Sequence, residues 1–196
     1  MQVIVISLPT AKERRSFQKR QLDGLELQHE ILDAIGWQNV EEARGTLNTE
    51  QWERVLMPTE LACFLSHRQV WQKIAEGHQP TLVLEDDVIL SSRTRDFLNA
   101  AKELKDVDHI SLETRLRHKL LGKHFKLNDE FNIARLYQDR TGAAAYILWP
   151  TGAKHLLQQA NINGAALADA FIANDYRLLS YQSIPALAIQ SDVSNP

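Results

Sequence analysis

The segment Thr81-Leu82-Val83-Leu84-Glu85-Asp86-Asp87 joins a short apolar run directly to three carboxylates. The apolar run has the length and composition of a buried β-strand. Side chains alternate along a strand, so Glu85 and Asp87 should share one side and Asp86 should take the other. Carboxylates held close together repel one another, and a hard cation such as Mn²⁺ or Mg²⁺ relieves that repulsion through oxygen ligands. The segment therefore predicts a metal site, with a solvated acidic turn as the alternative.

Apolar runs and helical periodicities alternate on both sides of this segment. We expect strands at 3–8, 31–35, 81–84, 109–112 and 146–149, and one or two more between 176 and 189. We expect helices at 10–25, 59–76, 93–104, 150–159 and 167–174, the second ending at Gly77 in a left-handed conformation. This alternation predicts an α/β sandwich with a mainly parallel central sheet, and ligands bind such sheets beyond the carboxyl ends of the strands.

The composition is that of a folded protein in a reducing compartment. The 196 residues include 22 Lys and Arg, 25 Asp and Glu and 44% hydrophobic residues, giving a net charge of −3. That apolar content excludes intrinsic disorder, and near-neutral charge argues against nucleic-acid binding. Cys63 is the single cysteine, and no apolar run nears the roughly 20 residues of a membrane span. We therefore expect one soluble domain over residues 1–196, located in the cytoplasm.

Four segments occur in order along the chain. They are Val3-Ile4-Val5-Ile6-Ser7-Leu8 with Arg14-Arg15, Glu60-Leu61-Ala62-Cys63-Phe64-Leu65-Ser66-His67 with Trp71, Leu84-Glu85-Asp86-Asp87, and Thr141-Gly142 to Tyr146-Ile147-Leu148, with Asp169 after them. Together they resemble glycosyltransferase family 25, bacterial lipooligosaccharide enzymes of which many are galactosyltransferases. The resemblance implies a GT-A type nucleotide-binding fold, a UDP-sugar donor, a divalent metal and inversion at the anomeric carbon. It also implies a glycan acceptor, the growing core of a lipooligosaccharide or lipopolysaccharide.

The resemblance also implies roles for particular residues. An inverting transfer needs a cation to neutralise the leaving diphosphate and a general base to take the acceptor proton. Glu85 and Asp87 would hold Mn²⁺ or Mg²⁺, Asp86 would contact the ribose or the donor sugar, and Asp169 would be the base. An Asp at a helix start is also a common cap, and Glu113 and Asp175 are alternative bases. The other expected substrate contacts are Ser7, Leu8, Arg14, Arg15, Ser66, His67, Thr141 and Gln190.

Several of these residues have a structural alternative. His67 has no acidic partner nearby in sequence, so a hydrolase triad is not indicated, and a buried histidine joining helix to sheet is the alternative to a substrate contact. Cys63 is interpreted as a small core residue rather than a nucleophile. Arg14 and Arg15 suit a phosphate because of their paired donors, but they also fit a solvated polar helix face.

Segment 115–126 is the one basic cluster, with leucines interleaved among Arg, Lys and His. It predicts a contact with an anionic membrane surface, a loop closing over the donor, or a solvated basic loop. The first option would place the protein peripherally at the inner membrane, near a lipid-linked acceptor. Two rival functions use the same acidic strand end: a metal-dependent phosphohydrolase of nucleotide-type substrates, and a non-catalytic nucleotide-sugar binding protein.

Overall fold

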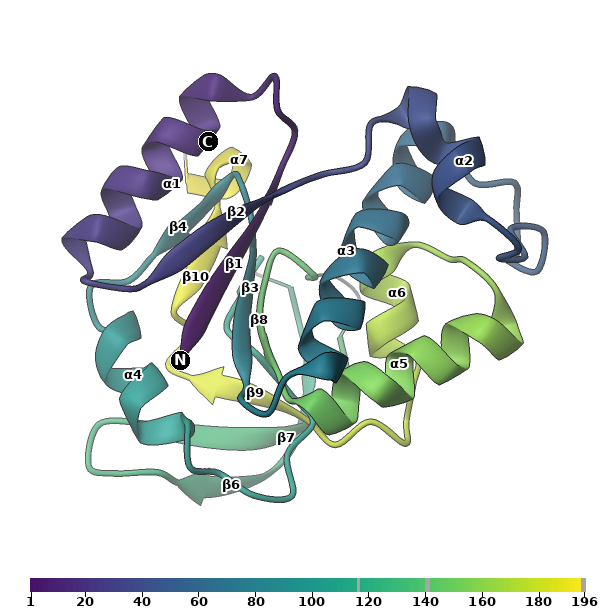
Figure 1. Cartoon of the computed structure of the whole chain (residues 1–196). Coiled ribbons are helices and arrows are strands. Elements are labelled where there is room, and N and C mark those ends of the chain that lie inside the picture. Colours follow the sequence, from purple (N-terminus) through teal and green to yellow (C-terminus); the bar gives the residue numbers. More distant parts are fainter. Residues whose placement is uncertain (116, 140–141, 195–196) are drawn as a thin grey trace.

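An eight-stranded sheet forms the centre of the protein, and helices cover both of its faces (Figure 1). The computed structural model describes residues 1–115, 117–139 and 142–194. Along the sheet the strands are β2 (His29–Asp33), β1 (Gln2–Ser7), β3 (Thr81–Glu85), β8 (Ala145–Leu148), β5 (His109–Ser111), β9 (Ser180–Ile184), β7 (Asn132–Gln138) and β6 (Leu120–Lys126). Two short strands, β4 (Val88–Leu90) and β10 (Ala188–Gln190), pair antiparallel in a separate sheet.

The direction of the strands confirms the predicted α/β class. Strands β2, β1, β3, β5, β9 and β6 point one way. Strands β8 and β7 point the other way and are antiparallel to both of their neighbours. The first three strands, β2, β1 and β3, are parallel, so their carboxyl ends lie at one edge of the sheet. The acidic residues at the end of β3 therefore lie at the edge where ligands are expected.

The helices divide between the two faces. On one face lie α1 (Lys12–Gly24) and α4 (Thr94–Ala101). On the other lie α3 (Pro58–Glu76), α5 (Pro150–Asn163) and α6 (Ala168–Ala173), with η1 (Trp37–Asn39) and α2 (Val40–Arg44) beside α3; α7 (Ser191–Ser194) follows β10. Alternate residues of β1 supply the two cores: Ile4 and Ile6 face α3, whereas Val3 and Val5 face the opposite helices.

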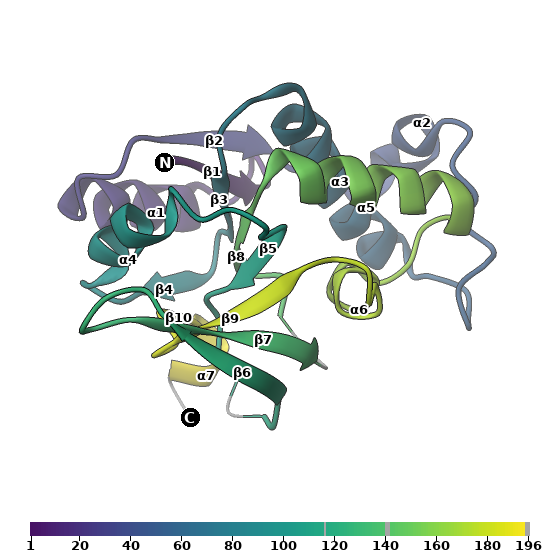
Figure 2. The same ribbon diagram turned by 90° about the horizontal axis from the view of Figure 1, so that it is seen from below.

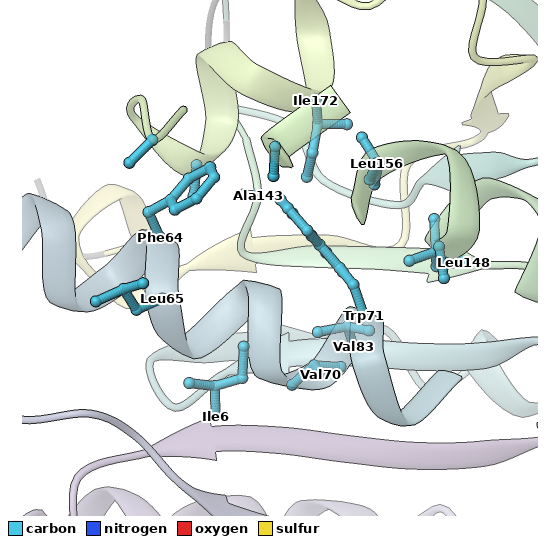
Figure 3. Packing of buried hydrophobic residues seen from close by; sticks show 14 of the residues in the cluster. Ile6, Phe64, Leu65, Val70, Trp71, Val83, Ala143, Leu148, Leu156 and Ile172 are labelled. Carbon is cyan, nitrogen blue, oxygen red and sulfur yellow. The ribbon is translucent and has the colours of Figure 1, made fainter. Parts of the chain in front are cut away.

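Trp71 anchors α3 to the sheet (Figure 3). Its ring is fully buried, packs edge-on against Phe64 at 5.7 Å and stacks on Phe171 of α6 at 5.7 Å. Its Nε1 donates a hydrogen bond of 2.9 Å to Tyr146 Oη on β8. Because Trp71 is held on both sides, the preceding turn of α3, which carries His67, is fixed next to the end of β3.

The predicted elements and the observed ones differ in three places. The hairpin β6–β7 was not expected, and it lies at the end of the sheet opposite β2 (Figure 2). The prediction of a loop over segment 115–126 was therefore wrong from Leu120 onward; its polar pattern failed to show a strand because the strand is at an edge. Strand β4 was also missed, and Gly77 ends α3 with an extended backbone, not a left-handed one. None of the helices in the described ranges is long and apolar enough to span a membrane.

Candidate active site

The acidic strand end is held between β1 and α3. Glu85 closes β3 beside Ile6 of β1, and Asp86 follows it. Asp86 accepts hydrogen bonds from Ser7 Oγ at 2.7 Å and from Arg14 at 3.0 Å. This contact with Asp86 raises the pKa of the Arg14 guanidinium further above its usual value. Asp86 thus faces the β1 side, as the alternation of side chains predicts.

Glu85 and Asp87 share the opposite side, where Gln190 contacts both. Gln190 of β10 lies opposite Val88 of β4, which brings its amide nitrogen within 3.5 Å of Glu85 Oε2 and 3.3 Å of both Asp87 oxygens. Burial raises the pKa of Asp87, Gln190 lowers it, and the neighbouring carboxylates of Glu85 and Asp86 raise it further. The Glu85 and Asp87 carboxylates supply oxygen donors of the kind that Mn²⁺ and Mg²⁺ prefer, and the Gln190 amide turns its nitrogen toward them.

His67 connects the core to Glu85 through a chain of hydrogen bonds. Trp71 Nε1 can only donate, so Tyr146 Oη accepts there, and the same hydroxyl lies within hydrogen-bond distance of His67 Nδ1, 2.9 Å away. Burial keeps Tyr146 protonated by raising the pKa of its hydroxyl. Burial lowers the pKa of His67, but Tyr146, Cys63 and Glu85 outweigh it and raise that pKa well above its usual value. A carboxylate can only accept, so His67 Nε2 donates to Glu85 Oε1 at 3.2 Å. The chain fixes both the ring orientation of His67 and the position of the Glu85 carboxylate.

This arrangement corrects one prediction. Cys63 was expected in the core, but it is exposed, with its Sγ 4.0 Å from Glu85 Oε1. His67 is fully buried and joins α3 to the sheet through Tyr146 on β8 and Glu85 on β3, the alternative to a substrate contact. A hydrolase triad does not form, because the acidic partner Glu85 lies at Nε2 and a tyrosine, not a carboxylate, lies at Nδ1.

Two clefts open beside the acidic strand end. The β1 cleft has a volume of ≈450 Å³, and Ser7, Leu8, Arg14, Trp37, Ser66 and Asp86 help to line it. The α6 cleft has a volume of ≈360 Å³, and Arg115, Arg117, Gly142, Leu167, Asp169 and Gln190 help to line it. Cys63 and Glu85 line both clefts. Glu85 therefore lies where the two clefts meet, with the predicted nucleotide contacts on one side and Asp169 on the other.

Some of the predicted substrate contacts near β1 already have partners within the protein. Arg15 points its guanidinium at the carbonyls of Ser7 and Leu8 and at the Asp33 carboxylate, and it does not line either cleft. Ser66 lines the β1 cleft, but its hydroxyl donates to Ala62 and accepts from the Ile35 backbone. The polar groups of Arg15 and Ser66 are therefore occupied by contacts within the protein, and they stabilise the backbone around the β1 cleft. Thr141 lies outside the described residues.

Asp169 is half-buried in the wall of the α6 cleft at the start of α6. Its Oδ1 accepts a 2.7 Å hydrogen bond from the backbone of Ala170, while Leu167 occupies the cap position. Of the alternative bases, Asp175 lies 2.7 Å from His155 Nε2 and lines neither cleft. Trp37 also lines the β1 cleft, and Arg115 and Arg117 of the basic segment line the α6 cleft. No local sequence pattern marks these three residues as cleft residues, because their place depends on tertiary contacts.

The other alternative base, Glu113, lies behind the α6 cleft. It is 1% exposed, and its Oε2 accepts a 3.1 Å hydrogen bond from the backbone of Ala144. Oε1 has no hydrogen-bond partner among the described residues. Burial, with the Glu85 carboxylate adding to it, raises the pKa of Glu113 to about 7 against the Ala144 hydrogen bond. Glu113 is therefore a carboxyl group that is still partly protonated near pH 7.

Replacing Glu113 with glutamine is expected to stabilise the protein in alkaline solution. The pKa of Glu113 is 4.5 in the unfolded chain and about 7 in the folded one, so the folded state binds this proton more tightly. The protonated carboxyl therefore stabilises the fold at low pH, and this stabilisation is lost as the pH rises from 4.5 to about 7. A pKa difference of this size corresponds to about 3 kcal/mol of stability. Glu113→Gln should therefore raise the melting temperature at pH 8 and not at pH 4. Thermal denaturation measures this, with exposed Glu103→Gln as control; equal shifts at both pH values would contradict it.

Comparisons of the sequence with known proteins show the family. The family model described as glycosyltransferase family 25 (LPS biosynthesis protein) matches residues 1–172. The lipooligosaccharide biosynthesis protein lex-1 of Haemophilus influenzae is 27% identical over 98% of this chain and 77% of its own length. Human inactive glycosyltransferase 25 family member 3 is 31% identical over 56% of this chain and 20% of its own. Mouse procollagen galactosyltransferase 2 is 27% identical over 59% and 20%. Since the family model spans most of the sequence, the chain belongs to glycosyltransferase family 25.

Proposed function

We propose that this protein transfers a hexose, galactose in particular, from a UDP-sugar to a lipooligosaccharide or lipopolysaccharide glycan, with inversion and with help from Mn²⁺ or Mg²⁺. The observation that carries the proposal is the position of Glu85 between the β1 cleft and the α6 cleft. A GT-A type transferase needs a nucleotide site and an acceptor site that meet at a metal-binding carboxylate. The names of lex-1 and of procollagen galactosyltransferase 2 support the acceptor class and the sugar, respectively.

The β1 cleft has the chemistry of a nucleotide site. Trp37 is 56% exposed on its wall and offers an aromatic face to the uracil ring. Asp86 and Ser7 would bind ribose hydroxyls, and Arg14 would lie near the diphosphate. These groups are already held in place by their own hydrogen bonds, so little ordering is needed when the nucleotide binds.

Replacing Trp37 with alanine is expected to weaken UDP binding by roughly 5- to 150-fold, the effect of losing about 1–3 kcal/mol of stacking on a base. Trp37 is an exposed residue of η1, so the fold should persist. Isothermal titration calorimetry with UDP measures the change. Trp37→Phe keeps an aromatic face and should retain most of the affinity. Equal affinity of the alanine and the phenylalanine variants would show that the base lies elsewhere.

The cation site and the α6 cleft supply the remaining groups. Glu85 and Asp87 would hold the metal, and a rotated Gln190 amide would add an oxygen. When bound, the metal neutralises charge on the leaving diphosphate. Arg115 and Arg117 place further positive charge in the α6 cleft. Asp169 would accept the proton of the acceptor hydroxyl as that oxygen attacks the anomeric carbon and UDP leaves from the opposite face.

A transfer assay tests the function. The protein is incubated with Mn²⁺, a lipooligosaccharide-derived acceptor and, in parallel, UDP-galactose, UDP-glucose or UDP-N-acetylglucosamine. Mass spectrometry is expected to find one hexose added from UDP-galactose, and EDTA is expected to stop the reaction. Steady phosphate release without a new glycan would indicate the phosphohydrolase. Nucleotide-sugar binding without turnover would indicate a silent binder, which the inactive human relative makes a real alternative.

We also propose that the protein works in the cytoplasm in peripheral contact with the inner membrane through β6. Lys119 is held by Asp139 and Gln182 at 2.6 Å each, whereas Lys123 and Phe125 are exposed on this outer strand, and Lys126 is exposed with Asp129 2.6 Å from its Nζ. Lys123→Glu combined with Lys126→Glu should then abolish sedimentation with vesicles containing anionic lipid. Neutral vesicles are the control. Undiminished sedimentation would place the contact elsewhere.

A further inference from the structure

Three side chains of different metal-binding chemistry converge where the two clefts meet. Cys63 and His67 lie one turn apart on α3, and Glu85 ends β3. The Cys63 Sγ, an imidazole nitrogen of His67 and a carboxylate oxygen of Glu85 all lie within 4.8 Å of one another. Among the residues that the structure describes, this is the one group of three or more such ligands. It is distinct from the oxygen donors Glu85 and Asp87.

The distances suit a tetrahedral zinc ion. Bonds of about 2.3 Å to sulfur and about 2.0–2.1 Å to nitrogen or oxygen separate neighbouring ligand atoms by about 3.3–3.6 Å. Here His67 Nε2 lies 3.2 Å from Glu85 Oε1, and Cys63 Sγ lies 4.0 Å from the same oxygen. The exposed thiol and the partly exposed carboxylate can rotate by this small amount without moving the backbone.

The surroundings of His67 are those of a metal-binding histidine. The ring is fully buried, and Tyr146 Oη lies 2.9 Å from Nδ1, the position from which an outer partner orients a ligating imidazole. Tyr146 has lone pairs to accept from both Trp71 Nε1 and His67 Nδ1, so the imidazole can hold a proton on Nδ1 and offer Nε2 to a metal. Because Cys63 and Glu85 line both clefts, the fourth metal position would open toward solvent.

We propose that Cys63, His67 and Glu85 bind a thiophilic divalent cation, Zn²⁺ above all, at a site that shares only Glu85 with the oxygen-donor pair. A thiolate and an imidazole favour Zn²⁺ over Mn²⁺ or Mg²⁺. On binding, the Cys63 thiol and His67 Nε2 each give up a proton to solvent while Nδ1 stays protonated, and the hydrogen bond from His67 to Glu85 is replaced by two metal bonds. Zn²⁺ would thus withdraw Glu85 from the Mn²⁺ site and obstruct the junction of the clefts. This inhibitory consequence rests on the proposed function; the binding site does not.

Co²⁺ is the direct probe, because it takes the place of Zn²⁺ and gives a thiolate charge-transfer band and tetrahedral visible bands. The chain has a single cysteine, so any thiolate band reports Cys63. The full chain titrated with Co²⁺ should show both features at one equivalent, and Zn²⁺ should erase them. Cys63→Ala should lose the thiolate band, and Glu85→Gln should weaken Co²⁺ binding by roughly 10- to 100-fold or more. Asp87→Asn is the matched control and should keep the spectrum.

Two results would overturn the site. The first is the absence of a thiolate band with excess Co²⁺ in folded protein. The second is a band of equal strength in Glu85→Gln, which would indicate a simple cysteine adduct. Alkylation of Cys63 by N-ethylmaleimide gives a second measurement that needs no variant, and Zn²⁺ should slow it in the wild-type chain while Mn²⁺ should not. Transfer activity enters neither readout, so failure of the proposed function is distinguishable from failure of this site.

Discussion

Replacing Asp87 with alanine is expected to abolish the Mn²⁺-dependent part of UDP binding, a loss of more than about 100-fold. Asp87 and Glu85 are the two carboxylates that Gln190 contacts together, and the pKa of Asp87 is raised because burial and its acidic neighbours penalise its charge. A divalent cation is the group that would offset this penalty. Calorimetric titration of UDP with and without Mn²⁺ measures the effect.

The stability of the same variant separates a lost ligand from a lost fold. The charged form of Asp87 destabilises the folded state, because burial raises the pKa of this carboxyl. At neutral pH and without metal, Asp87→Ala should therefore have a melting temperature equal to or above that of the wild type. Exposed Asp96→Ala on α4 serves as the control for both measurements. Glu85→Gln and Asp86→Asn then show which neighbour assists. Unchanged Mn²⁺-dependent affinity in folded Asp87→Ala would remove this residue from the metal site.

Asp169→Asn is expected to lower kcat by roughly 100- to 10,000-fold while UDP affinity stays within about twofold of wild type. The amide has the same shape and still accepts the hydrogen bond from the Ala170 backbone, but it cannot take a proton. Steady-state kinetics with saturating donor and acceptor measures the effect. Because Asp169 lies in the α6 cleft and not in the β1 cleft, nucleotide binding should be independent of it.

The alternatives to Asp169 as base have their own signatures. If Asp169 only stabilises the start of α6, the asparagine variant should retain its kcat and change only in melting temperature. Glu113→Gln should retain turnover, because Glu113 is buried behind Ala144, whereas a loss there with full activity in Asp169→Asn would make Glu113 the base. Asp175→Asn provides a matched exchange outside both clefts.

Local sequence patterns predicted the buried strand β3, the helix α3 and the sides taken by the acidic residues after β3. The run before Glu85 is continuously apolar because β3 is buried on both faces, and α3 shows helical spacing because one of its faces packs on the sheet. The sequence order of the acids also predicted that Asp86 would face away from Glu85 and Asp87. Strand β6 could not be found in this way, since it is an edge strand with mostly exposed polar residues.

The contacts that build the site are long-range, and local pattern does not contain them. Gln190 reaches Glu85 across 105 positions, and Tyr146 reaches His67 across 79. Cys63 keeps the apolar spacing of α3, yet its thiol is exposed and lines the β1 cleft while Phe64 and Leu65 beside it are buried. Each of these contacts depends on which strands become neighbours, and a single sequence read along its length does not specify that.

The chain of hydrogen bonds from Trp71 through Tyr146 and His67 to Glu85 has a consequence for how this protein can diverge. Each link joins a group that needs a donor to one that needs an acceptor, and the first three side chains have no access to water. A change at one position leaves an orphaned polar partner in the dry interior, which costs about 1–3 kcal/mol. Substitutions at these four positions should therefore be coupled in related sequences. A tolerated exchange of Tyr146 should be accompanied by an exchange of Trp71 or His67.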